Sequence, residues 1–160
     1  MLITADRSCL IVIDVQERLV PAMQAPARVI RNARVLMTAA SRLGVPILMT
    51  EQYPKGLGHI VPELGDLAKD ATVLEKIHFS CMNEPSFAAA FKKLDRRQAV
   101  IVGMEAHICV MQTGVNLMEQ GYEIFVVTDA TSSRTLESEK ACLDRLSAAG
   151  AGIVTTEMVV

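Results

Sequence analysis

Short runs of apolar, often β-branched residues recur along the chain and predict buried strands. They lie at residues 9–15, 46–50, 72–74, 99–103, 123–128 and 152–156. Continuous apolar runs are typical of the central strands of a parallel sheet that is covered on both faces. A surface strand would instead alternate apolar and polar positions.

Helical patterns separate these runs. Residues 27–43 carry apolar side chains on one face at three- and four-residue spacing: Val29, Ala33, Leu36, Met37, Ala40 and Leu43. Residues 86–94, 106–120 and 136–149 show similar patterns. A glycine directly follows residues 27–43, 106–120 and 136–149. This alternation predicts an α/β fold: a single doubly wound domain over residues 1–160, with a mostly parallel central sheet flanked by helices on both faces.

Composition narrows the classes of function. The chain has 160 residues, of which 51% are hydrophobic and 21% charged, which excludes intrinsic disorder. The formal charge is −2 and the basic residues form no block, so we expect neither a nucleic-acid partner nor an anionic membrane surface. No apolar run has the length of a membrane helix, residues 1–7 do not resemble a secretory signal, and the expected location is the cytoplasm.

In doubly wound sheets, ligands bind beyond the carboxyl ends of the strands, near the point where the strand order reverses. Two charged residues follow predicted strands in this way, Asp14 and Lys76. Asp14 is equally consistent with a cap of the following helix or with a partner for Arg18. Lys76 is distinguished from an ordinary surface lysine by its position alone.

Cys109 follows the fourth long apolar run, at a predicted strand–loop–helix junction. A thiol in the first turn of a helix is near the positive end of the helix dipole, which favours the thiolate. Free backbone N–H groups in that turn can bind an oxyanion. The alternative is a buried structural cysteine, which is our interpretation of Cys9 and Cys142. Neither these nor Cys81 forms a C-x-x-C pair, and all four are expected to be free thiols.

Motifs for cofactors are missing from the sequence. The glycine pairs at 56–58 and 150–152 do not complete a dinucleotide-binding motif, and there is no P-loop. The three histidines, His59, His78 and His107, have no metal-ligand spacing. We therefore expect no cofactor and no metal.

Several stretches together resemble the isochorismatase-like cysteine hydrolases, a superfamily that includes nicotinamidases and N-carbamoyl amidohydrolases. They are VIDVQ at 12–16, EK at 75–76, GMEAHICV at 103–110, VVTDA at 126–130 and SR at 133–134. The resemblance covers nearly the whole chain in order. The stretches TEQYP at 50–54 and KIHFS at 76–80 look most like the isochorismatase-domain-containing group.

The resemblance implies a catalytic triad and an amide-like substrate. Cys109 would be the nucleophile, Asp14 the base and Lys76 the cation that favours the charged forms of both. A cis peptide between Met104 and Glu105 would bring the Glu105 N–H beside that of Cys109 as an oxyanion hole. A thioester at Cys109 would then be hydrolysed, and a C–N bond of a small molecule would be cleaved.

The resemblance has further implications and departures. It suggests a homo-oligomer and leaves open a C-terminal segment after Val160. The metal-binding Asp-x-His of nicotinamidases is not found in residues 51–64, where His59 stands alone.

We expect substrate contacts from four residues near the strand ends: Gln52, Tyr53, Phe79 and His107. Core packing is an equal alternative for the two aromatic residues. Arg134 and Asp129 are expected to pair with each other. The alternatives to an enzyme are a non-catalytic interaction or regulatory module and a thiol redox protein that uses Cys81.

Overall fold

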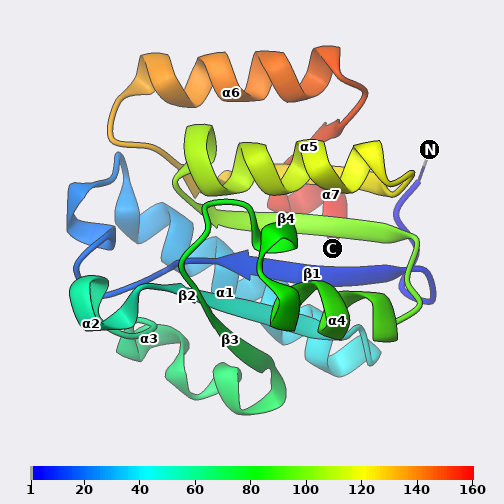
Figure 1. The fold of residues 1–160 in the computed structure, drawn as a ribbon, viewed down its shortest axis with the longest axis horizontal. Helices are drawn as coiled ribbons and strands as arrows, with labels where there is room; N and C mark the ends of the chain where they lie inside the picture. The colour runs from blue at the N-terminus through cyan, green and yellow to red at the C-terminus, as the bar shows by residue number, and fades with distance from the viewer. Residues whose placement is uncertain (1) are drawn as a thin grey trace.

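Six parallel strands form one sheet in the order β3-β2-β1-β4-β5-β6 (Figure 1). A computed structural model describes residues 2–160. The strands are β1 (Ser8–Ile13), β2 (Ile47–Gln52), β3 (Thr72–Lys76), β4 (Gln98–Met104), β5 (Glu123–Ser132) and β6 (Gly152–Val154). The order reverses between β1 and β4, so the carboxyl ends of these two central strands mark the switch point.

Helices cover both faces of the sheet. The long helix α1 (Pro26–Leu43) lies on one face with α7 (Thr156–Val159), whereas α4 (Pro85–Lys93), α5 (Met111–Glu119) and α6 (Leu136–Ala148) lie on the other (Figure 1). Short helical segments complete the chain: η1 (Val20–Ala22), α2 (Pro54–Leu57), α3 (Pro62–Gly65), η2 (Leu67–Asp70), η3 (Cys81–Asn83) and η4 (Ala106–Val110).

Side chains of the central strands alternate between two hydrophobic cores. In β1, Leu10 and Val12 pack on the α1 side, while Ile11 and Ile13 pack on the α4–α6 side. Successive residues of a strand point to opposite faces, so a strand that is covered on both faces is apolar throughout. This explains why the strands read as continuous apolar runs in the sequence.

The predicted fold class is confirmed, and the six predicted strands and four predicted helices are all present. Two elements differ in detail. β5 continues to Ser132, four residues past its prediction, because its register with β4 shifts between Ile101 and Gly103. The predicted helix at 106–120 begins with a wider turn, η4, in which the Val110 N–H donates to the Glu105 carbonyl, five residues back, at 3.2 Å.

Among residues 2–160, no helix combines the length and the apolar character needed to cross a bilayer.

Candidate active site

Asp14 follows β1 at the switch point and is fully buried. Its backbone is left-handed, with φ of 51°, a conformation that is uncommon outside glycine and concentrates at functional sites. Both carboxylate oxygens are bound: Thr50 Oγ1 donates to Oδ1 at 2.7 Å and Lys76 Nζ donates to Oδ2 at 2.8 Å. Arg18 instead donates to the Gly56 carbonyl, so neither alternative role for Asp14, helix cap or partner of Arg18, is what the structure shows.

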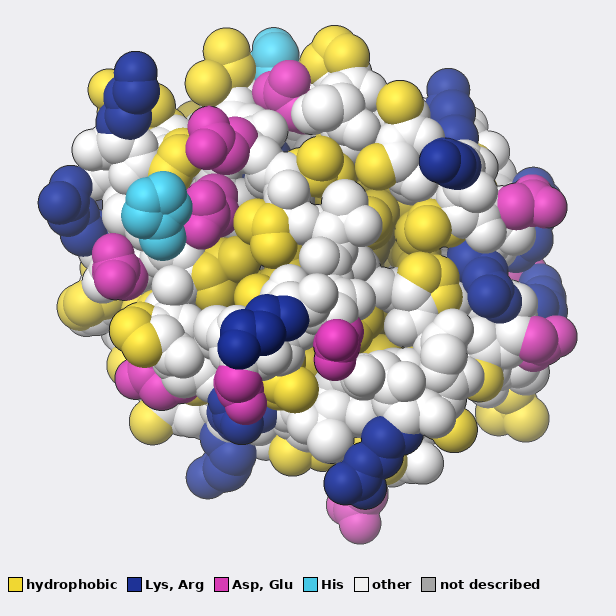
Figure 2. Space-filling view, turned by 90° about the horizontal axis from the view of Figure 1, so that it is seen from below, with side chains coloured by type: hydrophobic (Ala, Val, Ile, Leu, Met, Phe, Trp, Pro, Cys, Tyr) yellow, Lys and Arg dark blue, Asp and Glu magenta, His cyan; other side chains and the backbone are white. Residues whose placement is uncertain are grey.

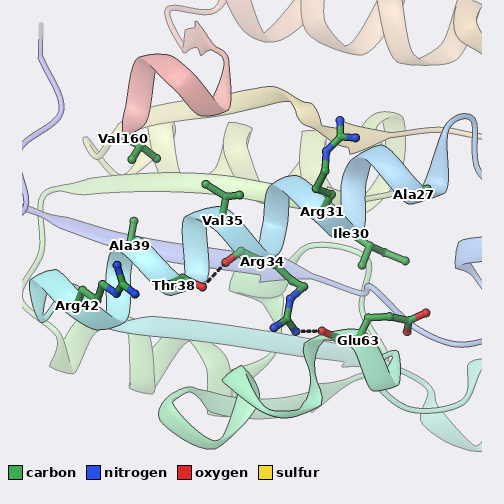
Figure 3. A pocket seen from close by; sticks show the side chains of 10 residues that line it. All are labelled: Ala27, Ile30, Arg31, Arg34, Val35, Thr38, Ala39, Arg42, Glu63 and Val160. Atoms are coloured by element: carbon green, nitrogen blue, oxygen red, sulfur yellow. Dashed lines mark hydrogen bonds between the residues drawn. The ribbon is translucent and has the colours of Figure 1, made fainter.

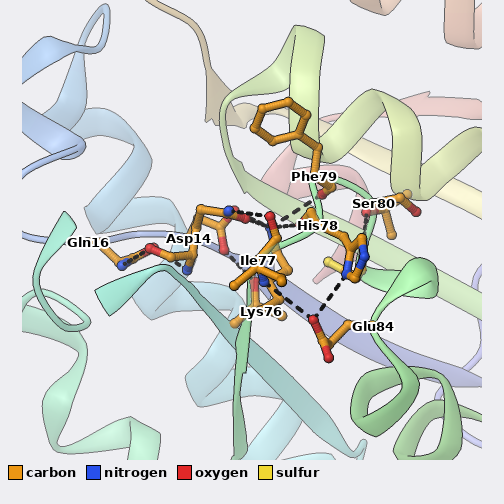
Figure 4. Close-up of polar contacts among 12 residues, drawn as sticks. Asp14, Gln16, Lys76, Ile77, His78, Phe79, Ser80 and Glu84 are labelled. Carbon is orange, nitrogen blue, oxygen red and sulfur yellow. Dashed lines mark hydrogen bonds and ion pairs between the residues drawn. The ribbon is translucent and has the colours of Figure 1, made fainter. Parts of the chain in front are cut away.

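Lys76 ends β3, and its side chain crosses the end of β2 to reach Asp14 (Figure 4). Its ammonium group is completely buried and has four oxygen neighbours. They are Gln52 Oε1 at 2.7 Å, Asp14 Oδ2 at 2.8 Å, and the carbonyls of His78 at 3.2 Å and Phe79 at 3.3 Å. Burial by itself would lower the pKa of Lys76, but the Asp14 carboxylate and the nearby thiols more than offset this effect, so the pKa is raised and the lysine stays charged.

Cys109 lies in η4, just before α5, and is 5% exposed. Burial, followed by the negative charge of Asp14, raises the pKa of its thiol to about 12, while the Lys76 ammonium acts in the opposite direction. The expectation of a stabilised thiolate is therefore wrong for the resting protein, because desolvation and a neighbouring carboxylate outweigh the cation and the helix end. The structure brings a neutral thiol to a buried Asp–Lys ion pair.

The turn between β4 and η4 contains a cis peptide between Met104 and Glu105, at the bond that the resemblance implies. Glu105 is buried, and its carboxylate accepts a hydrogen bond from Arg134 Nε at 2.8 Å. The expected pairing of Arg134 with Asp129 is therefore wrong. Asp129 Oδ1 instead accepts from the Thr156 N–H at 2.8 Å and hydroxyl at 2.9 Å, which ties β5 to the start of α7.

The four expected substrate contacts surround this centre in different ways. His107 is held by Ser133, whose Oγ lies 2.8 Å from His107 Nδ1. Tyr53 and Phe79 are 55% and 53% exposed, so neither is a core residue, and the Phe79 ring points away from Lys76 (Figure 4). Gln52 uses its side chain on the protein itself, because it accepts from Lys76 and donates to the Ile77 carbonyl at 2.9 Å.

Two residues of this network were missed by the sequence analysis. Thr50 binds the carboxylate of Asp14, and Gln16, which is fully buried, links the ends of β1 and β2. Thr50 could have been found from its position, since it closes a predicted strand and the carboxyl ends of parallel strands share one edge. Nothing local in the sequence distinguishes Gln16 from a surface glutamine.

A metal site does not fit the residues near His59. Its Nδ1 lies 3.1 Å from Glu51 Oε2, while Glu51 Oε1 accepts from the Ile60 N–H at 2.8 Å. Hydrogen bonding to Glu51, followed by the negative charge of Glu51, raises the pKa of His59. Among residues 2–160 there is no cluster of three or more His, Cys, Asp or Glu side chains able to hold a metal ion.

The other three cysteines are buried and unpaired with one another. Cys81 is closest in environment to the site, because the charges of Lys76 and Asp14 both act on its thiol, and burial raises its pKa to about 12. The backbone N–H of Cys81 donates to Thr113 Oγ1 at 3.0 Å. Cys142 donates to the carbonyl of Ala106, the first residue of η4, at 2.9 Å.

A hollow of about 750 Å³ lies away from these residues, along the outer surface of α1 (Figure 3). Its lining includes Arg31, Arg34, Val35 and Arg42 and contains no member of the Asp14–Lys76–Cys109 group. This hollow is thus separate from the candidate chemistry.

Comparison with known proteins identifies the family. The family model of the isochorismatase domain matches residues 8–158. The chain is 40% identical over 147 residues to isochorismatase domain-containing protein 1 of Danio rerio, covering 91% of this chain and 51% of that protein. It is 39% identical over 153 residues to isochorismatase domain-containing protein 2 of the same species, covering 95% and 76%.

Two solved structures share the fold. The MAR1 ribonuclease from Caenorhabditis elegans is 37% identical, with a TM-score of 0.92 over 98% of this chain and 81% of that one. The YcaC gene product from Escherichia coli, described as an octameric hydrolase of unknown specificity, is 25% identical, with a TM-score of 0.94 over 99% and 80%. The chain spans about half the length of the isochorismatase domain-containing protein 1 relatives that it matches.

Proposed function

Because the chain belongs to the isochorismatase family, we propose that it is a cysteine hydrolase that cleaves an amide-like C–N bond of a small molecule. The observation that carries this proposal is the fully buried Lys76–Asp14 pair at the switch point of the sheet, whose charges both act on the Cys109 thiol. Buried ion pairs are expensive to desolvate, and perturbed titratable groups in a cluster are typical of catalytic sites.

In the first half of the reaction, Cys109 Sγ attacks the substrate carbonyl carbon and its proton passes to the Asp14 carboxylate. The carbonyl oxygen becomes an oxyanion that the backbone N–H groups of Glu105 and Cys109 would hold. The C–N bond then breaks, and the proton on Asp14 moves to the departing nitrogen. The acyl group is left on sulfur as a thioester.

In the second half, Asp14 takes a proton from a water molecule whose oxygen attacks the thioester carbonyl. The C–S bond breaks, the proton returns to the sulfur of Cys109, and the carboxylic acid leaves. Lys76 holds the Asp14 carboxylate in place between these transfers, because its ammonium group donates to Asp14 Oδ2 at 2.8 Å. No redox step and no other cofactor is needed for this balance.

The proposed substrate is a small molecule, and Tyr53, Phe79 and His107 are the residues expected to contact it. Ribonuclease activity, named for the Caenorhabditis elegans relative, is a less favoured reading for this chain. The formal charge is −2, and on the face drawn in Figure 2 the Lys and Arg side chains are interspersed with Asp and Glu. A phosphate backbone is normally met by a clustered basic surface.

The second candidate is a non-catalytic interaction or regulatory module. The raised pKa and low exposure of Cys109 favour it, because a neutral, nearly buried thiol has little reactivity unless a base takes its proton. The octameric Escherichia coli relative adds a proposal common to both candidates, namely self-association of this chain, which size-exclusion chromatography with light scattering would test.

Alkylation of each cysteine by iodoacetamide, followed by peptide mass spectrometry across pH, separates the two candidates. If the site is assembled, Cys109 reacts faster than Cys9, Cys81 and Cys142 at neutral pH, and Lys76→Met slows it, because the Lys76 ammonium lowers the pKa of the Cys109 thiol. A screen of small amides and carbamoyl compounds for ammonia or amine release then follows, with Cys109→Ala as the control. Hydrolysis that persists at the wild-type rate in Cys109→Ala would end the nucleophile proposal.

A further inference from the structure

Gln52, at the end of β2, has both ends of its side-chain amide bound inside the protein. Its Oε1 accepts from Lys76 Nζ at 2.7 Å, which is the shortest of the four contacts of that ammonium group. Its Nε2 donates to the Ile77 carbonyl at 2.9 Å. The amide therefore spans from the tip of the Lys76 side chain to the backbone that immediately follows Lys76.

The backbone of Gln52 is in turn fixed by Gln16. Gln16 Oε1 accepts from the Gln52 N–H at 2.7 Å, and Gln16 Nε2 donates to the Gln52 carbonyl at 3.0 Å and to the Gly58 carbonyl at 2.7 Å. Gln16 is fully buried, and its own N–H donates to the Asp14 carbonyl at 2.8 Å. The segment that carries the base and the residue that contacts the lysine are thus joined by one buried amide.

The chemistry of an amide suits this position. An ammonium group has three N–H donors, and here the two shortest contacts are to one carboxylate and one neutral amide oxygen. A neutral acceptor fixes the direction of the ammonium without cancelling its charge. A second carboxylate at the same place would weaken the field that Lys76 exerts on Asp14 and on the Cys109 sulfur.

We propose that Gln52 is a positioning residue, which holds the Lys76 ammonium in line with Asp14, rather than a residue that contacts the substrate. This inference rests on the proposed hydrolase function. Without the amide oxygen, the N–H of Lys76 that Gln52 accepted has only the two longer contacts to the carbonyls of His78 and Phe79. The ammonium group then turns away from Asp14, and the Asp14 carboxylate loses its fixed partner.

The test uses Gln52→Met, which keeps the length of the side chain and removes both hydrogen-bonding groups, and Gln52→Glu, which keeps an acceptor for Lys76 but adds a negative charge. The readout is the rate of Cys109 alkylation by iodoacetamide across pH, which needs no substrate. Gln52→Met should slow alkylation at neutral pH about tenfold, as expected for the loss of one hydrogen bond to a charged group. Gln52→Glu should also slow alkylation relative to the wild type, because its added carboxylate weakens the field that Lys76 exerts on the Cys109 sulfur. Gln120→Met, an exposed site at the end of α5, is the matched control and should leave the profile unchanged.

Four outcomes would overturn the inference. If Gln52→Met leaves the alkylation profile unchanged and raises only the KM for a hydrolysed amide, Gln52 binds substrate instead. If Gln52→Met makes all four cysteines reactive and lowers the urea midpoint, its role is structural. If wild-type Cys109 is no faster than the other thiols and Lys76→Met has no effect, the proposed function fails together with the inference. A wild-type Cys109 that is fast and Lys76-dependent but insensitive to Gln52→Met refutes this inference alone.

Discussion

Gly103, the last residue but one of β4, is where a single methyl group should disrupt the site. It pairs with Ile13 in β1, immediately before Asp14, and has φ of +114°. A Cβ at this position would lie 2.0 Å from the Ile13 carbonyl oxygen and 2.7 Å from its nitrogen. These are backbone atoms of a central strand, so relief requires β1 and β4 to move apart.

The size of the effect follows from two contributions. A positive φ costs an L-residue about 1–2 kcal/mol. Since Cβ atoms essentially never approach other heavy atoms within 3.0 Å, the Ile13 backbone must shift by about 1 Å, and overpacking of this kind costs about 1–3 kcal/mol more. Gly103→Ala should therefore lower the free energy of unfolding by about 2–5 kcal/mol. The shift also moves Asp14, and a displacement of about 1 Å can reduce catalysis about a hundredfold.

Gly121→Ala is the matched control, because Gly121 has φ of +82° but no atom within 4 Å of the added Cβ. It should lose only the conformational part, about 1–2 kcal/mol. Urea unfolding of both variants, with Cys109 alkylation measured in the folded protein, gives the comparison. Equal losses of stability in the two variants, with unchanged Cys109 reactivity in Gly103→Ala, would refute the packing argument.

The remaining predictions concern charge, pH and metal. Lys76→Met should lower the free energy of unfolding by about 3–5 kcal/mol, because Asp14 stays buried without its partner. Arg134→Met, which removes a side chain that is 58% exposed, should lower it by less than about 1 kcal/mol. Similar urea midpoints for the two variants would contradict this prediction. Burial raises the pKa of the Cys9 thiol from 9.0 to about 12, so the folded thiol keeps a proton that the unfolded one releases. The contribution of Cys9 to the free energy of unfolding is therefore constant below pH 9. As the pH rises from 9 towards 12, this contribution falls by about 1.4 kcal/mol per pH unit. Urea titrations at about pH 8 and about pH 10 should therefore show a smaller decline for Cys9→Ala than for the wild type. EDTA should leave Cys109 alkylation and any hydrolysis unchanged, and a loss that zinc restores would show a metal requirement.

The sheet could be predicted from the sequence because burial on both faces makes each strand apolar throughout. The same reasoning placed Asp14 and Lys76 at strand ends, where parallel strands bring their carboxyl termini to one edge. The prediction for β5 ended too early, because residues 129–132 are mostly polar and continue the strand only through a register shift against β4. A register shift depends on the neighbouring strand, and the sequence of β5 alone carries no sign of it.

Sequence patterns did not identify the hydrogen-bond partners of long side chains. Arg134 was expected to pair with Asp129, yet it donates to the Glu105 carboxylate. The pKa of Cys109 was misjudged for a related reason. The helix end and the cation were visible in the sequence, whereas the depth of burial of the thiol, which raises its pKa most, required the fold.

The raised pKa of Cys109 agrees with the proposed chemistry once the charges of the site are counted together. Asp14 and Lys76 form a neutral pair at rest, and a free thiolate beside them would leave a net negative charge in a buried place, which desolvation opposes. During attack, the proton moves from sulfur to Asp14 while negative charge develops on the substrate oxygen. The ammonium of Lys76 then balances that oxyanion instead of the carboxylate, and the site stays neutral at each step. A thiol that keeps its proton until a carbonyl arrives is therefore what a buried Asp–Lys pair requires, and the fixed position of the ammonium, rather than a preformed thiolate, becomes the condition for reactivity.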